Sequence, residues 1–166
     1  MDVFQIGAVQ RLKASDIYST SLCNLFSQKK VKKIQFSVPI PLRDSGLQLC
    51  QFPLFSEKEI IKMKKGGKYK YVHFGCFRII VSPRTVAQGV SSYRPLSVGL
   101  FDTKHSNLAD AVGGCYRGSL NRGYQYKDIY PTVSMPVDDA KFWNVLLSLA
   151  GVDMEMGSIP CSVMVE

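Results

Sequence analysis

Apolar and polar residues alternate in several short segments of this chain, which is the pattern of strands that bury one face. Most of these segments are bounded by proline, glycine or acidic residues. We expect strands over residues 34–40, 47–52, 69–81, 95–101, 124–130 and 159–165. The longest of them, 69–81, is rich in β-branched and aromatic residues and carries the strongest strand signal.

Three other segments follow a helical pattern. Ser56 and Glu59 have the spacing of a capping box, which predicts a short helix that ends at the glycine pair 66–67. Residues 107–114 have room for one or two helical turns before a second glycine pair. Apolar residues at helical spacing over 138–149 predict another helix, opened by two aspartates.

The order of these elements indicates a mainly β protein. The predicted strands outnumber the helices and do not alternate regularly with them, which argues against a doubly wound α/β sheet. We therefore expect a mainly antiparallel β-sandwich with two or three short helices. A length of 166 residues fits a single domain over residues 1–166, in which the weakly patterned residues 1–30 could form a flexible N-terminal segment.

The charge balance narrows the choice of partners. The chain has 21 lysines and arginines against 13 acidic residues, a net charge of +8, which favours nucleic acid or an anionic membrane face as a partner. The first residues lack a charged segment followed by an apolar run, so we expect no signal peptide and no secretion. The longest apolar runs, 72–81 and 145–152, are far shorter than the roughly 20 residues of a membrane span, so any membrane contact would be peripheral.

Residues for catalysis or metal binding are sparse. Five widely spaced cysteines without a C-x-x-C motif argue against both a disulfide framework and a zinc site. His73 lies in an apolar strand and is best explained as a structural imidazole. A small hydrolase could use Asp102, His105 and Cys115, but no local sequence signature of a hydrolase surrounds them. We expect no enzyme activity, no cofactor and no metal.

Two clusters of lysines dominate the basic residues. The first contains Lys29, Lys30, Lys32 and Lys33, and the second contains Lys58, Lys62, Lys64, Lys65, Lys68 and Lys70. Lysines can simply protect sheet edges from aggregation, which explains a few of them but not ten in two short windows. The second cluster continues into Tyr69 and Tyr71, and cations beside aromatic rings suit single-stranded nucleic acid. Fourteen lysines against seven arginines favour contact with phosphates over the reading of bases.

The second half of the chain carries an ordered series of motifs. The apolar strand 72–81 is followed by Leu96-Ser97-Val98-Gly99-Leu100-Phe101-Asp102-Thr103-Lys104, an apolar run with Asp102 and the basic Lys104 behind it. The glycine pair Gly113-Gly114, the aromatic strand 123–127, the predicted helix 138–149 with Trp143 and the strand 161–163 come next. In this order, over residues 68–166, the series resembles the thirty-kilodalton superfamily of plant-virus movement proteins, typified by the tobamovirus protein.

This resemblance implies a jelly-roll-like β-sandwich without catalytic activity. It also implies binding of viral single-stranded RNA or DNA without sequence preference, and self-association into oligomers or tubules. The implied location is the cytoplasm and plasmodesmata of the host plant cell, with contacts to plasmodesmal and endomembrane components such as the endoplasmic reticulum. Asp102 and Lys104 take the positions of the family's landmark residues, and Gly113 and Gly114 those of its glycine-containing turn. Members usually continue into a variable, often charged tail, whereas this sequence ends at Glu166.

A second hypothesis is a capsid-like jelly-roll protein that assembles a virus shell, whose basic strands would also touch nucleic acid. The order of the motifs favours a movement protein. Assembly into closed shells, instead of filaments or tubules, would favour the capsid-like protein.

Overall fold

A computed structural model describes residues 36–43, 46–65, 69–84, 95–131, 133–152 and 154–166. The chain divides between residues 33 and 34, and everything described belongs to the second unit. The predicted binding residues Lys29, Lys30, Lys32, Lys33 and Lys68 lie outside the described residues. The single domain over 1–166 stays a prediction.

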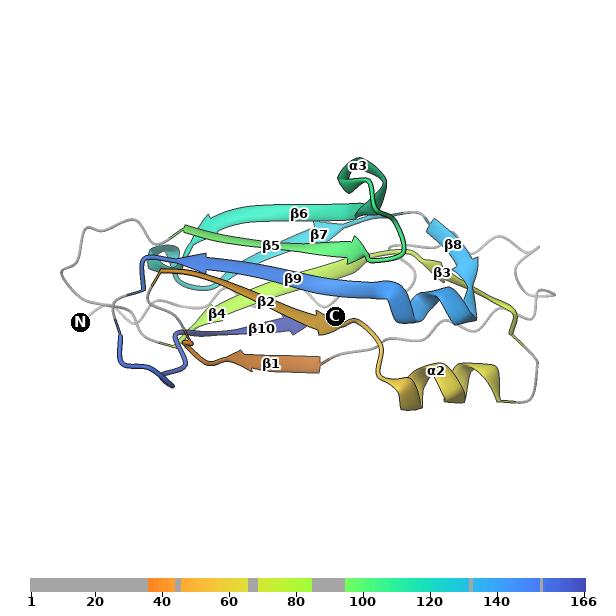
Figure 1. The fold of residues 1–166 in the computed structure, drawn as a ribbon, viewed down its shortest axis with the longest axis horizontal. Helices are drawn as coiled ribbons and strands as arrows, with labels where there is room; N and C mark the ends of the chain where they lie inside the picture. Colours follow the sequence, from red (N-terminus) through yellow and green to blue (C-terminus); the bar gives the residue numbers. More distant parts are fainter. Residues whose placement is uncertain (1–35, 44–45, 66–68, 85–94, 132, 153) are drawn as a thin grey trace. The chain divides into compact units, whose positions relative to one another are not determined.

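Two four-stranded antiparallel sheets form the fold (Figure 1). The first sheet has the order β1 (Phe36–Ile40), β10 (Cys161–Val165), β4 (Phe77–Pro83) and β7 (Gln125–Ile129). The second sheet has the order β2 (Leu47–Pro53), β9 (Trp143–Ala150), β5 (Pro95–Asp102) and β6 (Val112–Ser119). Every neighbouring pair in both sheets is antiparallel.

The connections between these strands are those of a jelly roll. The chain crosses from one sheet to the other after β1, β2, β4, β6, β7 and β9, so strands distant in sequence become neighbours. Eight strands in two such sheets make the double Greek key found in jelly rolls. The predicted jelly-roll-like antiparallel sandwich is therefore confirmed.

Smaller elements adjoin the sandwich. A two-stranded ribbon pairs β3 (Tyr71–Phe74) with β8 (Val133–Pro136). Among the described residues, the helices are α2 (Glu57–Lys64) and α3 (Leu108–Ala111), with 3-10 turns η2 (Leu120–Arg122) and η3 (Val137–Phe142). Helix α2 packs against η3, and β3 and β8 also contact η3. These four elements thus lie together.

The core consists of apolar side chains from both sheets. Ile79 and Val163 contribute from the first sheet, and Val98 and Leu147 from the second, and all four are essentially inaccessible to water. Alternate residues along each strand point to this core, which is the two-residue period that the sequence predicted.

The predicted helix over 138–149 is wrong. Its first part is the 3-10 turn η3, and its second part is β9, a central strand that pairs with β2 on one side and β5 on the other. Trp143, Val145 and Leu147 alternate into the core. The outer face of β9 is mostly half-buried and partly apolar, so the strand reads as a nearly continuous apolar run in which helical spacing occurs by chance.

The predicted strand over 69–81 is interrupted. Gly75 and Cys76 separate β3 from β4, which belong to different sheets. The glycine pair predicted to form a turn instead lies within β6, whose register with β5 shifts between Leu100 and Phe101 and skips Gly113. β6 and β8 were not predicted, whereas β1, β2, β5, β7 and β10 fall in predicted segments.

Candidate nucleic-acid interface

The lysine-bearing helix α2 begins at a complete capping box. The Ser56 hydroxyl accepts a hydrogen bond from the Glu59 backbone N–H at 3.3 Å, and Glu59 Oε2 accepts one from the Ser56 N–H at 2.9 Å. Ile60 is buried in the core, and Met63 packs against it. The cap and the two apolar anchors fix both the start of the helix and its rotation about its axis.

The opposite face of α2 carries a row of cations. Lys58, Lys62 and Lys65 follow one another at spacings of four and three residues, which places them one above the other on a helix. All three are exposed, and among the described residues none of them forms an ion pair. Like charges at this spacing repel by about 0.2–0.5 kcal/mol per pair, so an anion bound along the row would relieve a strain already present. We call these three residues the α2 lysine row.

Lys64 lies elsewhere on the helix. Its ammonium group forms an ion pair with Asp138 of η3, although both side chains are about half exposed. The neighbouring Asp139 accepts a hydrogen bond from Lys104 Nζ at 2.8 Å, and that carboxylate raises the pKa of Lys104. Two of the predicted basic residues are thus already matched with carboxylates, and their charge is less available to a polyanion.

The ribbon next to α2 adds one more cation and an aromatic ring. The Lys70 carbonyl accepts a hydrogen bond from the Val137 N–H at 3.1 Å, which ties the start of β3 to η3. The Lys70 side chain is exposed, and Tyr71, opposite Pro136, is 70 % exposed. Tyr69 is half-buried. Because α2 and β3 both contact η3, the α2 lysine row, Lys70 and Tyr71 lie on elements that pack around η3.

The predicted landmark Asp102 organises the turn after β5. Its Oδ1 accepts a hydrogen bond from the Lys104 N–H at 2.9 Å, and its other oxygen lies 3.6 Å from His105 Nε2. Both the backbone N–H and the hydroxyl of Thr103 donate to the Phe142 carbonyl at 2.9 Å. These bonds join the end of β5 to the junction of η3 and β9, and they are structural in kind.

The motif glycines make room for two large side chains. A Cβ atom on Gly113 would collide with the ring of Trp143, and one on Gly114 would collide with Ile129. Gly114 also has a φ angle of 153°, which side-chain-bearing residues rarely adopt. Gly113 and Gly114 therefore serve packing at the β6 bulge, and nothing in their surroundings indicates contact with a ligand.

The described residues contain four cysteines, Cys50, Cys76, Cys115 and Cys161, and all four are free thiols. Burial raises the pKa of Cys76, and it raises that of Cys161 to about 11, which makes both poor nucleophiles at neutral pH. Within the described ranges, no group of side chains has the makeup of a metal site, and no helix is long and apolar enough to cross a membrane.

One cluster was missed by the sequence analysis. Arg78 lies in the apolar strand β4, is nearly buried, and forms a two-pronged ion pair with Asp128 of β7, with N–O distances of 2.6 and 2.8 Å. Its guanidinium carbon lies 5.0 Å from the centre of the Tyr126 ring. The signal in the sequence was the alternation of Tyr124, Tyr126 and Tyr130, which was used only to predict a strand.

Comparison with known proteins gives one family. The family model described as "Viral movement protein (MP)" matches residues 2–166. No curated protein sequence gives a significant match. Among solved structures, "Turnip Yellow Mosaic Virus" is similar at 9 % identity and a TM-score of 0.48, over 80 % of this chain and 86 % of that one. "Tobacco Necrosis Virus" is similar at 11 % identity and a TM-score of 0.46, over 80 % and 78 % of the two chains.

Proposed function

Because this chain belongs to the viral movement protein family, we propose that it binds single-stranded nucleic acid without sequence preference and carries the viral genome between plant cells through plasmodesmata. The cargo is viral RNA or DNA in the host cytoplasm, and delivery brings the protein to plasmodesmal and endomembrane components. The proposal contains no catalytic step, cofactor or metal.

The observation that carries the proposal is the α2 lysine row. Lys58, Lys62 and Lys65 point away from the anchors Ile60 and Met63, so the helix presents them to solvent as a group. Lysine ammonium groups contact phosphates as point charges and do not read base edges, which supports binding without sequence preference. Lys70 and the exposed Tyr71 extend the same region, and an aromatic ring can stack on an unpaired base. Lys64 contributes less, because Asp138 already matches its charge.

The test reverses two charges of the row. In Lys62→Glu/Lys65→Glu, affinity for a single strand should fall at least about tenfold at low salt for every base sequence alike. The slope of log affinity against log salt should become shallower by about 0.7 for each phosphate that the variant no longer neutralises. Fluorescence anisotropy with labelled 20-mers at several salt concentrations measures both quantities.

A matched control separates this surface from net charge. Arg84→Glu/Arg117→Glu makes the same change in charge at exposed residues of β6 and of the segment after β4. It should bind nearly as the unaltered protein does. Equal decreases in affinity in the two double variants would contradict the assignment of the α2 lysine row. In leaf epidermis, the Lys62→Glu/Lys65→Glu protein should remain in the first transfected cell while the control spreads.

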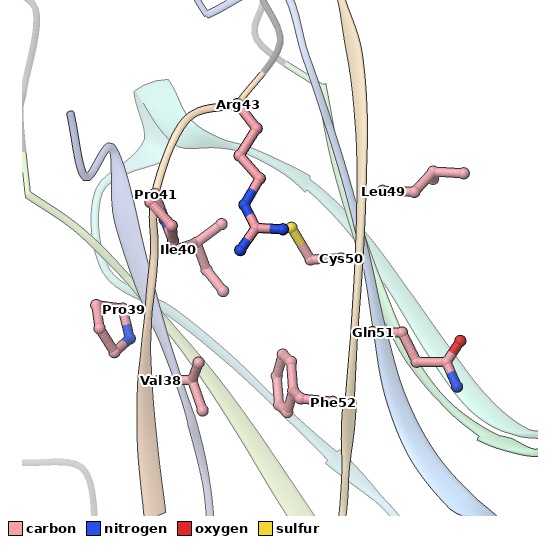
Figure 2. A pocket seen from close by; sticks show the side chains of 9 residues that line it. All are labelled: Val38, Pro39, Ile40, Pro41, Arg43, Leu49, Cys50, Gln51 and Phe52. Carbon is pink, nitrogen blue, oxygen red and sulfur yellow. The ribbon is translucent and has the colours of Figure 1, made fainter. Parts of the chain in front are cut away.

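We propose that the protein self-associates through the edge of the sandwich formed by β1 and β2. These two strands flank a groove of about 220 Å³, into which Val38, Ile40 and Phe52 point, whereas Leu49 points away from it (Figure 2). Leu47 and Leu49 on the outer side of β2 are 60 % and 73 % exposed. No described strand pairs with the outer edge of β2, and the strand carries no charge. Such an edge is suited to pairing with the same edge of a second copy.

The capsid-like alternative is supported by the strand order alone. Double-sheet jelly rolls occur in viral capsid domains, and the eight strands have that arrangement. Electron microscopy of the concentrated protein with single-stranded nucleic acid distinguishes the two functions. Coated filaments or tubules agree with a movement protein, and closed shells of uniform size would favour the capsid-like protein.

A further inference from the structure

Three tyrosines lie in and beside the edge strand β7. Side chains two residues apart on a strand point to the same side, so Tyr126 and Asp128 share one face of β7, and the buried Gln125 and Ile129 share the other. Tyr124 and Tyr130 directly flank the strand at the positions that continue the face of Tyr126. Tyr124, Tyr126 and Tyr130 are 39, 51 and 57 % exposed. We call these three residues the tyrosine stripe.

One ring of the stripe lies against a buried cation. The guanidinium of Arg78 lies 5.0 Å from the centre of the Tyr126 ring. Burial and Glu166 raise the pKa of Tyr124, and the charge of Arg78 opposes that rise. The Cys76 thiol raises the pKa of Tyr130, and the charge of Arg78 again opposes the rise. Arg78 thus contacts the middle ring and acts on the two outer tyrosines through its charge.

Charges near the stripe are partly matched. Both oxygens of Asp128 are bound by Arg78, so its repulsion of a phosphate is largely cancelled. Glu166 is a second carboxylate that acts on the stripe, since it raises the pKa of Tyr124. Arg122, two residues before Tyr124, is exposed and can take phosphate charge, whereas Lys127 lies on the opposite face of β7.

We propose that the tyrosine stripe is a base-stacking surface, on which successive unpaired bases of a single-stranded nucleic acid lie against the rings. Positions two residues apart on an extended strand are separated by roughly 6.6–6.8 Å, and positions four apart by about twice that distance. The spacing from Tyr124 to Tyr126 and the wider one from Tyr126 to Tyr130 therefore both leave room for a base beside each ring. Stacking accepts any base, because every base has an aromatic face. A preference of tyrosine for strands would explain one or two of these residues. It does not explain three exposed rings in sequence, the middle one of which lies against a buried cation.

This inference rests on the proposed function and adds a second contact to it. The α2 lysine row holds the phosphates and cannot tell a strand with bases from one without them. The tyrosine stripe holds the bases. The two contacts therefore make different predictions for an abasic strand, which keeps the sugar–phosphate backbone and lacks every base.

The experiment compares two probes and two variants. The probes are a fluorescein-labelled 20-mer of thymidine and an abasic 20-mer, at 150 mM salt. The unaltered protein should bind the thymidine strand at least tenfold more tightly than the abasic one. Tyr124→Thr/Tyr126→Thr/Tyr130→Thr should bring this ratio close to one, because threonine keeps the strand preference and loses the ring. Tyr124→Phe/Tyr126→Phe/Tyr130→Phe keeps the rings and should keep the ratio.

The results test the stacking surface and the proposed function separately. A ratio near one for the unaltered protein, or an unchanged ratio for the threonine variant, would overturn the stacking surface and leave the proposed function in place. If the unaltered protein bound neither probe, the proposed function and this inference would fall together. If the triple variant does not fold, Tyr126→Thr and Tyr130→Thr are tested singly. Each should lower the ratio about fivefold or more, and no change in either would overturn the inference.

Discussion

At the scale of single residues, several positions that look functional in the sequence are explained by packing. Gly113 and Gly114 were predicted from the resemblance to form a turn, yet each leaves space for a neighbour, the first for Trp143 and the second for Ile129. Trp143 lies in the same sheet as the glycines and Ile129 in the other sheet. One glycine pair therefore admits a large side chain from each layer of the sandwich.

Cys161 is a residue at which pH should act on stability. Burial raises the pKa of its thiol to about 11, whereas an unfolded cysteine ionises near 9. The folded state thus holds a proton that the unfolded state releases. The contribution of the protonated Cys161 thiol to the free energy of unfolding is complete below pH 9 and is lost as pH rises through 11. The total loss is roughly 3 kcal/mol. Urea unfolding between pH 8 and 11 should show a steeper loss of stability for the unaltered protein than for Cys161→Ala. Parallel losses would contradict this.

At the scale of elements, the capping box decides whether α2 presents its lysines. Ser56→Ala removes the acceptor for the Glu59 N–H and should cost about 1 kcal/mol, mostly as fraying of the first turn. Ser56→Asp keeps an acceptor and should be close to neutral. Hydrogen exchange of the α2 amides measures the fraying directly. Uniform exchange in the two variants, with equal affinity for single strands, would mean that the cap has no such role.

Elements with a clear local signature were predictable from the sequence, and β6 and β9 were not. The alternation in β2 and β7 and the capping box of α2 each leave such a signature. In β9 the residues between the core positions are mostly half-buried and partly apolar, so its apolar run satisfied a helical period as well as a strand period. β6 was missed because its glycines resemble a turn, and their reason for being glycine lies in Trp143 and Ile129, far away in the sequence.

The two candidate surfaces also differ in how far the sequence could predict them. The α2 lysine row is a local cluster, and composition together with the cap was enough to predict it. The sequence could not tell that Lys64 faces Asp138, because that pairing joins residues 74 positions apart. The tyrosine stripe depends on Arg78 and Asp128, which meet only through the pairing of β4 with β7. Such contacts between distant segments require the fold.

At the scale of the whole molecule, the edge strands β1 and β2, beyond which no described strand pairs, are protected unequally. β1 contains Pro39, which has no N–H to offer an added strand, so this edge is poorly suited to further pairing. The part of β2 from Leu47 to Phe52 contains neither proline nor charge, and leucines occupy its exposed side. Edge strands of soluble proteins usually carry a lysine or a proline for protection. Their absence from this part of β2 favours the strand as the place where two copies meet.

Antiparallel pairing of two β2 strands about Leu49 would set Leu49 against Leu49 and Leu47 against Gln51, and would gather four leucines on one face. A single strand pair buries less than the roughly 1,200 Å² of a typical stable interface, so the association should be weak and depend on concentration.

Leu47→Lys/Leu49→Lys restores the protection that other edges carry and should keep the protein monomeric in sedimentation velocity at concentrations where the unaltered protein associates. Ile61→Lys adds a charge at another exposed apolar residue and should leave association intact. Because the β2 variant keeps the α2 lysine row, its affinity for a short oligonucleotide should be unchanged while assembly along a long strand is abolished. Association of the β2 variant at the same concentration as the unaltered protein would place the contact elsewhere.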